Sequence, residues 1–562
     1  MGPDLRAQGG ADQQHPLAGE PAGRQVSARR LVGLETEYGI IRPGMPKANA
    51  TVLSAQIVDS YAQLVAQGDA RVQGARWDYA DESPLQDARG FAINRADAHP
   101  SQLTDVEPDQ QEGIWTAESI ALSGNDARIG STLYQEKDTT DVVMNMVLGN
   151  GARLYVDHAH PEYSSPESTS PRAAVLWDQA GDEVMRRAAD SAQRLGGGQL
   201  LLYKNNTDNK SVSYGAHENY LVPRAVEFSA LVSGLTPFFA TRQIFCGAGR
   251  VGRGMLGERA EFQISQRADF FEAEVGLETT INRPIINTRD EPHAVWDKYR
   301  RLHVIIGDAN LGQISTLLRV GTTNLVLSLI EAGLAPALEL EDPVAALQQI
   351  SHDPSLATAV RLRGGRRLSA IQIQREYLLA AQGYCASRGI EDADTAEILQ
   401  RWEAVLDLLE RDPLLAADQV DWIAKYKLVT TFAQRHGLGL DDPRIGLMDL
   451  QWADLRQDKG LYYRLAARGA MQSLFSQEQI NQAVVAPPED TRAYLRGMTL
   501  QRYAPYVVAA NWDALTFAVP GARRVNRVFL SEPLGGSRKD VGRLFEANLE
   551  IDEFINKLAP RA

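Results

Sequence analysis

The stretch RLVGLETEYGI, residues 30 to 40, predicts a β-strand with two unlike faces. Alternation along the strand places one set of side chains on an apolar face: Val32, Leu34, Thr36, Tyr38 and Ile40. Glu35 and Glu37 share the opposite face, about 7 Å apart. Two carboxylates at that spacing are tolerated inside a protein only beside cations or hydrogen-bond donors. A buried functional face and a solvent-facing edge are both compatible with this strand alone.

A second strand with one polar face is predicted at residues 152 to 158, ARLYVDH. Alternation sends Arg153, Tyr155 and Asp157 to the same side of this strand. The turn that follows, AHPEYSSPE, supplies a further carboxylate, Glu162. The two polar strands therefore indicate one ionisable surface built on a sheet.

Later segments complete a mixed fold. Ser170 followed by Pro171 is typical of the N-cap and first position of a helix. Further strands are predicted at residues 199 to 204 and 301 to 306. Helical periodicity is predicted in three later stretches: 317 to 335, 370 to 386 and 394 to 410. A large sheet followed by a helical region is expected.

Length and charge limit the classes of partner. The 562 residues exceed the roughly 250 to 300 at which single cores stop growing, so a large unit with a smaller one is expected. A formal net charge of -14 disfavours nucleic acid and anionic membrane as main partners. No run of 18 apolar residues predicts a transmembrane helix. Only two cysteines, Cys246 and Cys385, occur, outside any CxxC motif, so the cytoplasm is the expected compartment.

Two segments are expected to lie outside the compact fold. Residues 1 to 28 are rich in Gly, Ala, Pro and Gln without the apolar core of a signal peptide, which predicts a disordered N-terminal tail. Residues of about 92 to 143 lose periodicity and carry far more acidic than basic side chains, which predicts a mobile insertion. A lid, a binding loop and a tolerated surface loop are all compatible with that insertion.

The ionisable residues of the first 310 positions favour a magnesium and nucleotide site. Glu35, Glu37 and Glu162 with one imidazole are donors that suit a hard cation such as Mg²⁺. Several arginines occur in the same half of the chain: Arg153, Arg242 and Arg289. Guanidinium groups bind phosphate or carboxylate bidentately, so this set fits a site for a triphosphate and an acidic substrate end.

Five motifs in this order resemble the Pup ligase and deamidase-of-Pup family. They are GLETEYGI (33–40), NGARLYVDHAHPEY (150–163), KNNTDNKSVSYGAHENYL (204–221), INTRDEPHA (286–294) and RRLHVIIGDAN (300–310). The resemblance covers nearly everything from residue 29 onward. It implies an α+β fold of the glutamine-synthetase-like, carboxylate-amine ligase type, with a curved, mostly antiparallel sheet packed by helices. Residues 29 to 478 are then the expected catalytic domain, and residues 479 to 562 the small C-terminal domain.

The resemblance also implies roles for individual residues. Magnesium-site residues are implied at Glu35, Tyr155 and Glu162, and Glu37 is expected beside them on the same strand face. ATP contacts are implied at Arg153, Ser165 and Trp512. Further ligands or phosphate contacts are implied at His217 and His303, and phosphate or substrate clamps at Arg242 and Arg289. Asp157 aligns with the catalytic aspartate of the family. It could attack the amide carbonyl directly, or it could act as a general base on water.

The family holds two opposite activities. Three segments resemble the hydrolase branch. They are the motif RWDYADESPLQDARGF (76–91), the insertion after it, and the motif YVDHAHPEY (155–163). That branch implies cleavage of the isopeptide between the C-terminal glutamate of Pup and substrate lysines, deamidation of a C-terminal glutamine of Pup, and ATP as a bound cofactor. Pupylated proteins, the bacterial proteasome and its ATPase are the implied partners. The alternative is a Pup ligase that consumes ATP. An idle Pup-binding protein would be expected to lack Glu35 or Asp157.

Overall fold

The computed structural model describes residues 25–66, 75–79, 82–96, 98, 142–207, 212–252, 261–521 and 524–558. Within these ranges, no helix has the length and apolar character needed to cross a membrane. The predictions for residues 1–24 and for 99–141 of the acidic insertion lie outside the described residues. The tail prediction is wrong for residues 25–28, because Val26 and Ala28 are buried and the Val26 amide donates to the Gly389 carbonyl.

The centre of the molecule is a six-stranded antiparallel sheet. Its order is β15 (Tyr299–Val304), β10 (Ala216–Pro223), β1 (Val32–Glu37), β8 (His160–Ser164), β7 (Arg153–Asp157) and β6 (Asn145–Val147). The strands predicted at 152–158 and 301–306 are confirmed. The strand predicted at 30–40 is divided, because β2 (Gly39–Ile41) leaves the central sheet and pairs with β9 (Leu201–Tyr203). The predicted alternation nevertheless holds, since Leu34 and Tyr38 are both buried.

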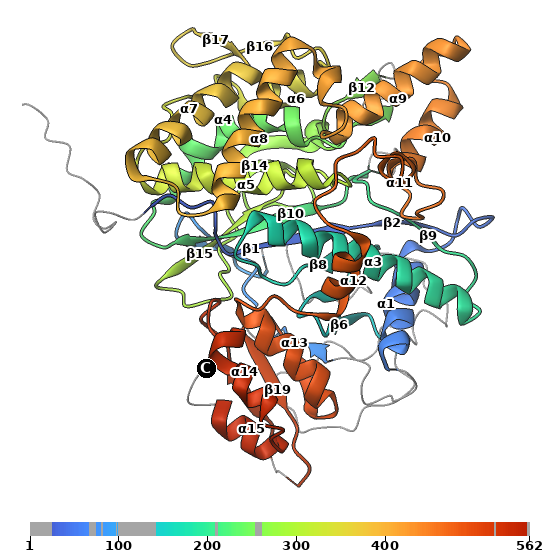
Figure 1. The fold of residues 1–562 in the computed structure, drawn as a ribbon, viewed down its shortest axis with the longest axis vertical. Helices are drawn as coiled ribbons and strands as arrows, with labels where there is room; N and C mark the ends of the chain where they lie inside the picture. Colours follow the sequence, from blue (N-terminus) through green and yellow to red (C-terminus); the bar gives the residue numbers. More distant parts are fainter. Residues whose placement is uncertain are drawn as a thin grey trace, which may run out of the picture.

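Helices cover the apolar face of this sheet (Figure 1). The main group is α4 (Phe228–Cys246), α5 (Gln313–Glu331), α6 (Pro343–Ser351), α7 (Ala370–Arg388), α8 (Ala393–Arg411) and α9 (Asp421–His436). Their apolar side chains form one cluster with Leu34, Tyr220 and Leu302 of the sheet. α10 (Pro443–Trp452) and α11 (Leu461–Ala466) follow. The predicted helices thus exist, as α5, α7 and α8, and they leave the opposite face of the sheet for polar side chains.

A second cluster lies on the same face, under β8 and β7. It is formed by α1 (Ala50–Ala66), α3 (Pro171–Arg194) and α12 (Gln477–Val485), which pack on Leu154 and Tyr163. α3 begins as predicted, with the Ser170 hydroxyl accepting a hydrogen bond from the Ala173 amide at 3.1 Å and proline at the first helical position. The start of α3 is therefore fixed directly after the polar strand β8.

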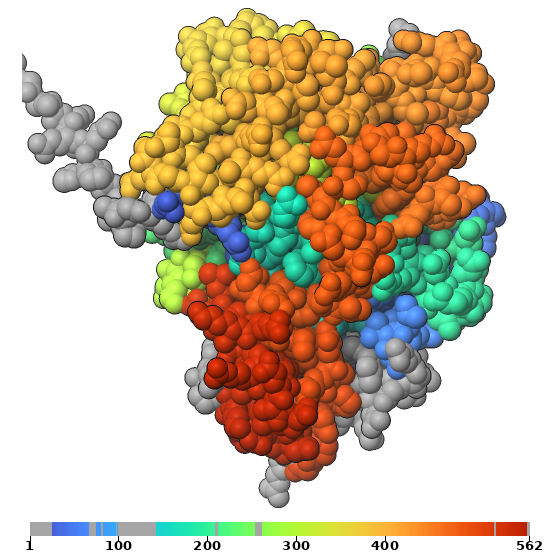
Figure 2. Space-filling view, in the orientation of Figure 1, coloured from blue at the N-terminus to red at the C-terminus, as the bar shows by residue number. Residues whose placement is uncertain are grey.

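The C-terminal residues form a smaller unit with its own core, seen at the bottom of Figures 1 and 2. It contains α13 (Arg492–Tyr503), β18 (Val507–Ala510), β19 (Ala514–Phe517), β20 (Asn526–Phe529), α14 (Arg538–Glu546) and α15 (Ile551–Leu558). β3 (Arg76–Trp77), from the N-terminal part of the chain, pairs in parallel with β18. The predicted division at residue 479 stays a prediction; Ala483 and Val484 of α12 belong to the second cluster.

Short two-stranded sheets complete the described elements. They are β4 (Gln86–Asp87) with β5 (Phe91–Ala92), β11 (Arg250–Gly252) with β12 (Glu261–Gln263), β13 (Phe271–Gly276) with β14 (Arg283–Asn287), and β16 (Ala359–Arg361) with β17 (Arg367–Ser369). The 291–293 segment, which follows β14, runs along the side of the central sheet where the smaller unit docks, because the Arg492 side chain donates to the His293 carbonyl at 2.6 Å.

Candidate active site

Register places the predicted ionisable residues on one face of the central sheet. Glu35 of β1 pairs with His217 of β10 on one side and with Ser164 of β8 on the other. Glu162 of β8 pairs with Glu37 of β1 and with Tyr155 of β7. Directly paired residues in antiparallel strands point to the same face. Four strands, β10, β1, β8 and β7, therefore contribute to one polar surface, opposite the helices.

Glu35 lies in a chain of hydrogen bonds that crosses β1, β10 and β15. Its carboxylate is 3.2 Å from His217 Nδ1 and accepts from Asn219 Nδ2 at 2.9 Å. The Asn219 carbonyl oxygen in turn accepts from Arg301 at 2.8 Å and lies 2.9 Å from His303 Nδ1. Burial alone would raise the pKa of Glu35, but the hydrogen bond and charge of His217, aided by Arg301, hold that pKa at about 2. Glu35 is thus held ionised.

A second group of carboxylates lies across β1, β8 and β7. The Glu37 carboxylate accepts from the Gly215 amide at 2.7 Å and lies 3.2 Å from His160 Nδ1. Asp157 Oδ2 lies 3.1 Å from Nδ1 of His158, a residue with a positive φ of 51°. Burial would raise the pKa of Asp157, yet the charge and hydrogen bond of His158 lower it. Asp157 is therefore held ionised at the edge of the cluster.

Glu162 lies between these two groups. Burial, followed by the charges of Asp157 and Glu37, raises the pKa of Glu162 well above its usual range. Glu35, Glu162 and His217 each offer a ligand atom within 4.8 Å of the others, and so do Glu37, Asp157 and Glu162. Carboxylate oxygens with an imidazole are donors for a hard divalent cation. A cation would also offset the repulsion that Glu162 experiences, so these residues fit a metal.

Arg153 is held at the β7 edge of the polar face by aromatic rings. Its guanidinium carbon lies 3.8 Å from the Tyr155 ring centroid and 3.9 Å from that of Trp77. Arg153 Nε donates to Asn145 at 3.1 Å. Trp77 meets Trp512 edge to face, with centroids 5.2 Å apart. Arg153 and Trp512, which are distant in the sequence, thus both contact the indole of Trp77.

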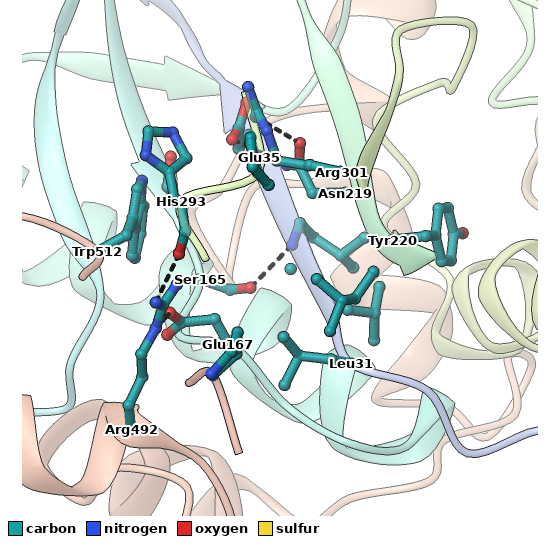
Figure 3. Close-up of a pocket in the computed structure, with 17 residues that line it drawn as sticks. Leu31, Glu35, Ser165, Glu167, Asn219, Tyr220, His293, Arg301, Arg492 and Trp512 are labelled. Atoms are coloured by element: carbon teal, nitrogen blue, oxygen red, sulfur yellow. Dashed lines mark hydrogen bonds and ion pairs between the residues drawn. The ribbon is translucent and has the colours of Figure 1, made fainter. Parts of the chain in front are cut away.

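A pocket opens beside Glu35, between the sheet and the smaller unit (Figure 3). Its apolar lining comes from residues 31–34, Tyr220 and Leu221, and Trp512 and His293 face this lining. Ser165 belongs to the lining, and its hydroxyl accepts from the Leu34 amide at 2.9 Å. One end is therefore apolar and aromatic, while the other reaches Glu35, Asn219 and Arg301.

The structure gathers most predicted site residues but not all of them. It brings these onto the polar face or into the pocket: Glu35, Glu37, Arg153, Tyr155, Asp157, Glu162, Ser165, His217, His303 and Trp512. Arg289 lies near their β15 end, since its charge contributes to lowering the pKa of both Arg301 and His303. Arg242 requires a correction. It is buried on α4 and pairs with Glu218, whose side chain points to the helix-covered face, so it is a structural ion pair rather than a phosphate clamp.

Four residues near the site were not predicted. Asn219 joins Glu35, Arg301 and His303, and the alternation of β10 that exposes His217 would also have placed it on the polar face. Glu167, Arg492 and Arg496 form buried ion pairs next to the pocket. These carry no sequence signal, because their partners are more than 300 residues apart in the chain.

Fold and site together define a class: α+β proteins whose acidic centre crosses an antiparallel sheet, with a pocket between that sheet and a smaller C-terminal unit. The family model described as Pup-ligase protein matches residues 30–516, and the chain belongs to this family. The predicted glutamine-synthetase-like α+β fold class is confirmed.

Individual relatives span nearly the whole chain. A depupylase of Acidothermus cellulolyticus is 48% identical over 94% of this chain and 99% of its own length. A Pup deamidase/depupylase of Mycobacterium tuberculosis is 47% identical with the same coverage. A chain in the crystal structure of the complex between Pup and its ligase PafA gives a TM-score of 0.71 at 30% identity, covering 95% of this chain and 92% of that one. PafA in complex with ADP gives 0.65 at 37%, covering 72% and 90%.

Proposed function

We propose that this chain is an amide hydrolase that cleaves the isopeptide bond between the C-terminal glutamate of Pup and lysines of pupylated proteins. The same activity would deamidate a C-terminal glutamine of Pup. The supporting observation is that relatives 47 to 48% identical over 94% of the chain are named depupylase or Pup deamidase/depupylase. A ligase of Arthrobacter is 42% identical and covers 69% of this chain.

The cofactors proposed are ATP and Mg²⁺. The ADP complex of PafA supports a nucleotide site, and the pocket here offers the Trp512 ring beside an apolar lining for a base. Its other end, at Glu35 and Arg301, leads to the carboxylate cluster. Glu35, Glu162 and His217 would hold Mg²⁺ there, with Glu37 and Tyr155 adjacent. When bound, the metal supplies positive charge that stabilises a developing oxyanion.

Asp157 is the proposed catalytic residue. It is partly exposed at the edge of the acidic cluster, and His158 keeps its carboxylate ionised. An ionised carboxylate here has two roles open to it. It can attack the amide carbon, releasing the lysine amine and leaving an anhydride that water cleaves, or it can take a proton from the attacking water. Arg153, fixed by Trp77 and Tyr155, is positioned to hold an anionic group nearby.

The proposed partners are Pup, pupylated proteins and, through them, the bacterial proteasome and its ATPase in the cytoplasm. The family model, which is that of a Pup-ligase protein, and the PafA structures keep a ligase as the second candidate. A catalytically idle member is not favoured, because Glu35 and Asp157 are both present and both held ionised.

The proposal is tested with the purified chain, Mg²⁺, ATP and a Pup-conjugated protein, followed by gel, beside Asp157→Asn. Loss of conjugate with release of free Pup is expected for the wild type. In the variant the rate should fall by at least about 100-fold, because its amide cannot act as nucleophile or base. New conjugates formed from free Pup and free target protein, with ADP accumulating, would instead identify a ligase.

A further inference from the structure

The wall between the pocket and the smaller unit contains a buried group of three charged side chains, which we call the arginine clamp: Glu167, Arg492 and Arg496. Arg492 Nε donates to the Glu167 carboxylate at 2.7 Å, and Arg496 binds the same carboxylate through both terminal nitrogens. The Arg496 side chain is fully buried and that of Arg492 is 4% exposed. Breaking a buried ion pair is costly, because it leaves an uncompensated charge inside the protein. The three side chains are therefore expected to keep this arrangement.

Each arginine of the clamp also holds one wall of the pocket. Arg496 Nη1 donates to the Trp512 carbonyl at 2.9 Å, and its guanidinium carbon lies 4.9 Å from the Trp512 ring centroid. Arg492 Nη1 donates to the carbonyls of His293 at 2.6 Å and of Leu530 at 2.8 Å. Figure 3 shows Arg492 reaching the His293 backbone, with Trp512 beside it. The clamp therefore connects the Trp512 wall of the smaller unit to the 291–293 segment of the larger one.

Glu167 connects both walls to the acidic centre. It follows β8 by three residues, and β8 carries Glu162 and Ser164. Arg496 also donates twice to the Gly151 carbonyl, at 2.8 and 3.0 Å, in the turn that precedes β7. Arg496 is not among the described residues that line the pocket, whereas Trp512 is. An effect of Arg496 on a ligand in the pocket must therefore act through the residues it holds.

We propose that the arginine clamp sets the position of Trp512 against the pocket, so that Arg496 is a positioning residue for the nucleotide. This inference rests on the proposed function, because it takes ATP as the ligand of the pocket. One carboxylate pairs with two guanidinium groups, so the clamp also leaves a net positive charge beside the pocket, which favours an anionic ligand.

The test is a double-mutant cycle on the full chain, with the Kd of ATP measured in the presence of Mg²⁺ by titration calorimetry. Arg496→Lys keeps the charge but loses the fork that joins Glu167, Gly151 and Trp512. It should weaken ATP binding at least about 5-fold, since members of one ion-pair network couple by factors of that size. In a Trp512→Ala background, the same change should alter the Kd by less than about 2-fold.

Conjugate cleavage separates positioning from general loss of folding. At saturating ATP, Arg496→Lys should keep kcat within about 2-fold of the wild type, whereas loss of folded protein would lower kcat without changing Kd. Arg538→Lys is the matched control, because its ion pair with Glu489 lies exposed on the same unit, and it should leave the Kd unchanged. If Arg496→Lys does not fold, Glu167→Gln replaces it in the cycle. Glu167 lines the pocket, so its charge acts on the Kd equally in both backgrounds, and the expected result is a Kd change that differs between the wild-type and the Trp512→Ala background.

Two results would overturn the inference. One is an ATP affinity of Arg496→Lys equal to that of the wild type. The other is that Arg496→Lys weakens ATP binding by the same factor in the wild-type and in the Trp512→Ala background. The wild-type chain is titrated with ATP first. If it binds no ATP, the nucleotide site of the proposed function is itself overturned, and this result is distinct from a failure of the arginine clamp.

Discussion

Glu162 occupies the least favourable position of the carboxylates on the polar face. It is buried between Glu37 and Tyr155 in the register of the sheet, and the charges of three neighbouring carboxylates add to the effect of burial in raising its pKa. Such a group is tolerated in a folded protein when a bound cation compensates it. Without a cation, this arrangement of carboxylates therefore lowers the stability of the folded protein.

Glu162→Gln tests this reading of the acidic centre. The substitution removes a repelled charge, so the metal-free protein should gain roughly 1 kcal/mol in its free energy of unfolding, the usual size of such an effect. The stabilisation that Mg²⁺ with ATP gives the wild type should be lost at the same time. Urea denaturation with a chelator and then with Mg²⁺ and ATP measures both changes.

Glu403→Gln, at an exposed position in the middle of α8, is the control and should change neither quantity. A variant at Glu162 that is destabilised in chelator, yet still gains as much from Mg²⁺ and ATP as the wild type, would show that Glu162 is no metal ligand.

Strand alternation predicted the part of this face that lies on β1 and β7. Glu162 was expected in a turn but lies in strand β8, and His217 was implied only by the family resemblance. Alternation placed Glu35 with Glu37 and Arg153 with Asp157, because a period of two is set by the backbone and does not depend on distant partners. The role of Arg242 could not be predicted in this way. Arg242 lies on a helix, and the sequence does not show which face of the sheet that helix covers. It therefore does not show whether the arginine meets a ligand or a buried glutamate. The arginine clamp was invisible for a similar reason: its partners meet only in the folded chain.

Helix α3 packs closely on β8, the strand that carries Glu162, through a contact between a glycine and a tyrosine. Gly181 of α3 lies against the buried ring of Tyr163, and a Cβ at that glycine would lie 2.4 Å from the ring. Tyr163 points to the helix-covered face, opposite its neighbour Glu162. Real Cβ atoms do not tolerate such a distance, so the absence of a side chain at Gly181 sets the spacing of helix and strand.

Gly181→Ala is expected to destabilise the protein by about 2 kcal/mol, because the ring or the helix must move in a packed core. Gly383→Ala is the matched control. Gly383 also lies inside a helix, α7, but a Cβ there meets nothing within 4 Å. The control should stabilise by about 0.5 to 1 kcal/mol, since alanine favours helix. Thermal unfolding measures both changes, and equal effects of the two substitutions would contradict the packing described.

Elements were predicted best where signals are local. The start of α3 followed from Ser170 and Pro171, and the strands at β7, β9 and β15 followed from alternation. The split between β1 and β2 was missed, because the residues keep alternating while the pairing partner changes from β10 to β9. Pairing of β3 with β18 was missed as well, since these strands are more than 400 residues apart and two-residue strands give no periodicity.

Docking of the smaller unit depends on Glu167. Burial would raise the pKa of this carboxyl group, but the charges and hydrogen bonds of Arg496 and Arg492 hold it at about 2, below the ordinary value of 4.5. A group with a lowered pKa in the folded protein stabilises it above its unfolded pKa, and that stabilisation is lost as the pH falls from about 4.5 toward 2. At neutral pH the contribution is roughly 3 kcal/mol.

Glu167→Gln should therefore be less stable than the wild type at pH 7. The difference in free energy of unfolding should narrow by about 1 kcal/mol between pH 7 and pH 3.5, because the wild-type carboxylate begins to be protonated on unfolding. Urea denaturation of both proteins at each pH gives this difference directly. A difference that is constant across this range would show that Glu167 has an ordinary pKa and does not hold the two units together through its charge.

In the proposed reaction, the molecule hydrolyses Pup conjugates while ATP stays bound and is not consumed. The most direct measurement counts ADP and free Pup in the same reaction, with a conjugate in large excess over ATP. We expect many conjugates to be cleaved for each ADP formed, and no cleavage when ATP is omitted. One ADP for each isopeptide bond made, with conjugates accumulating from free Pup and free target protein, would contradict this expectation and assign the chain to the ligases.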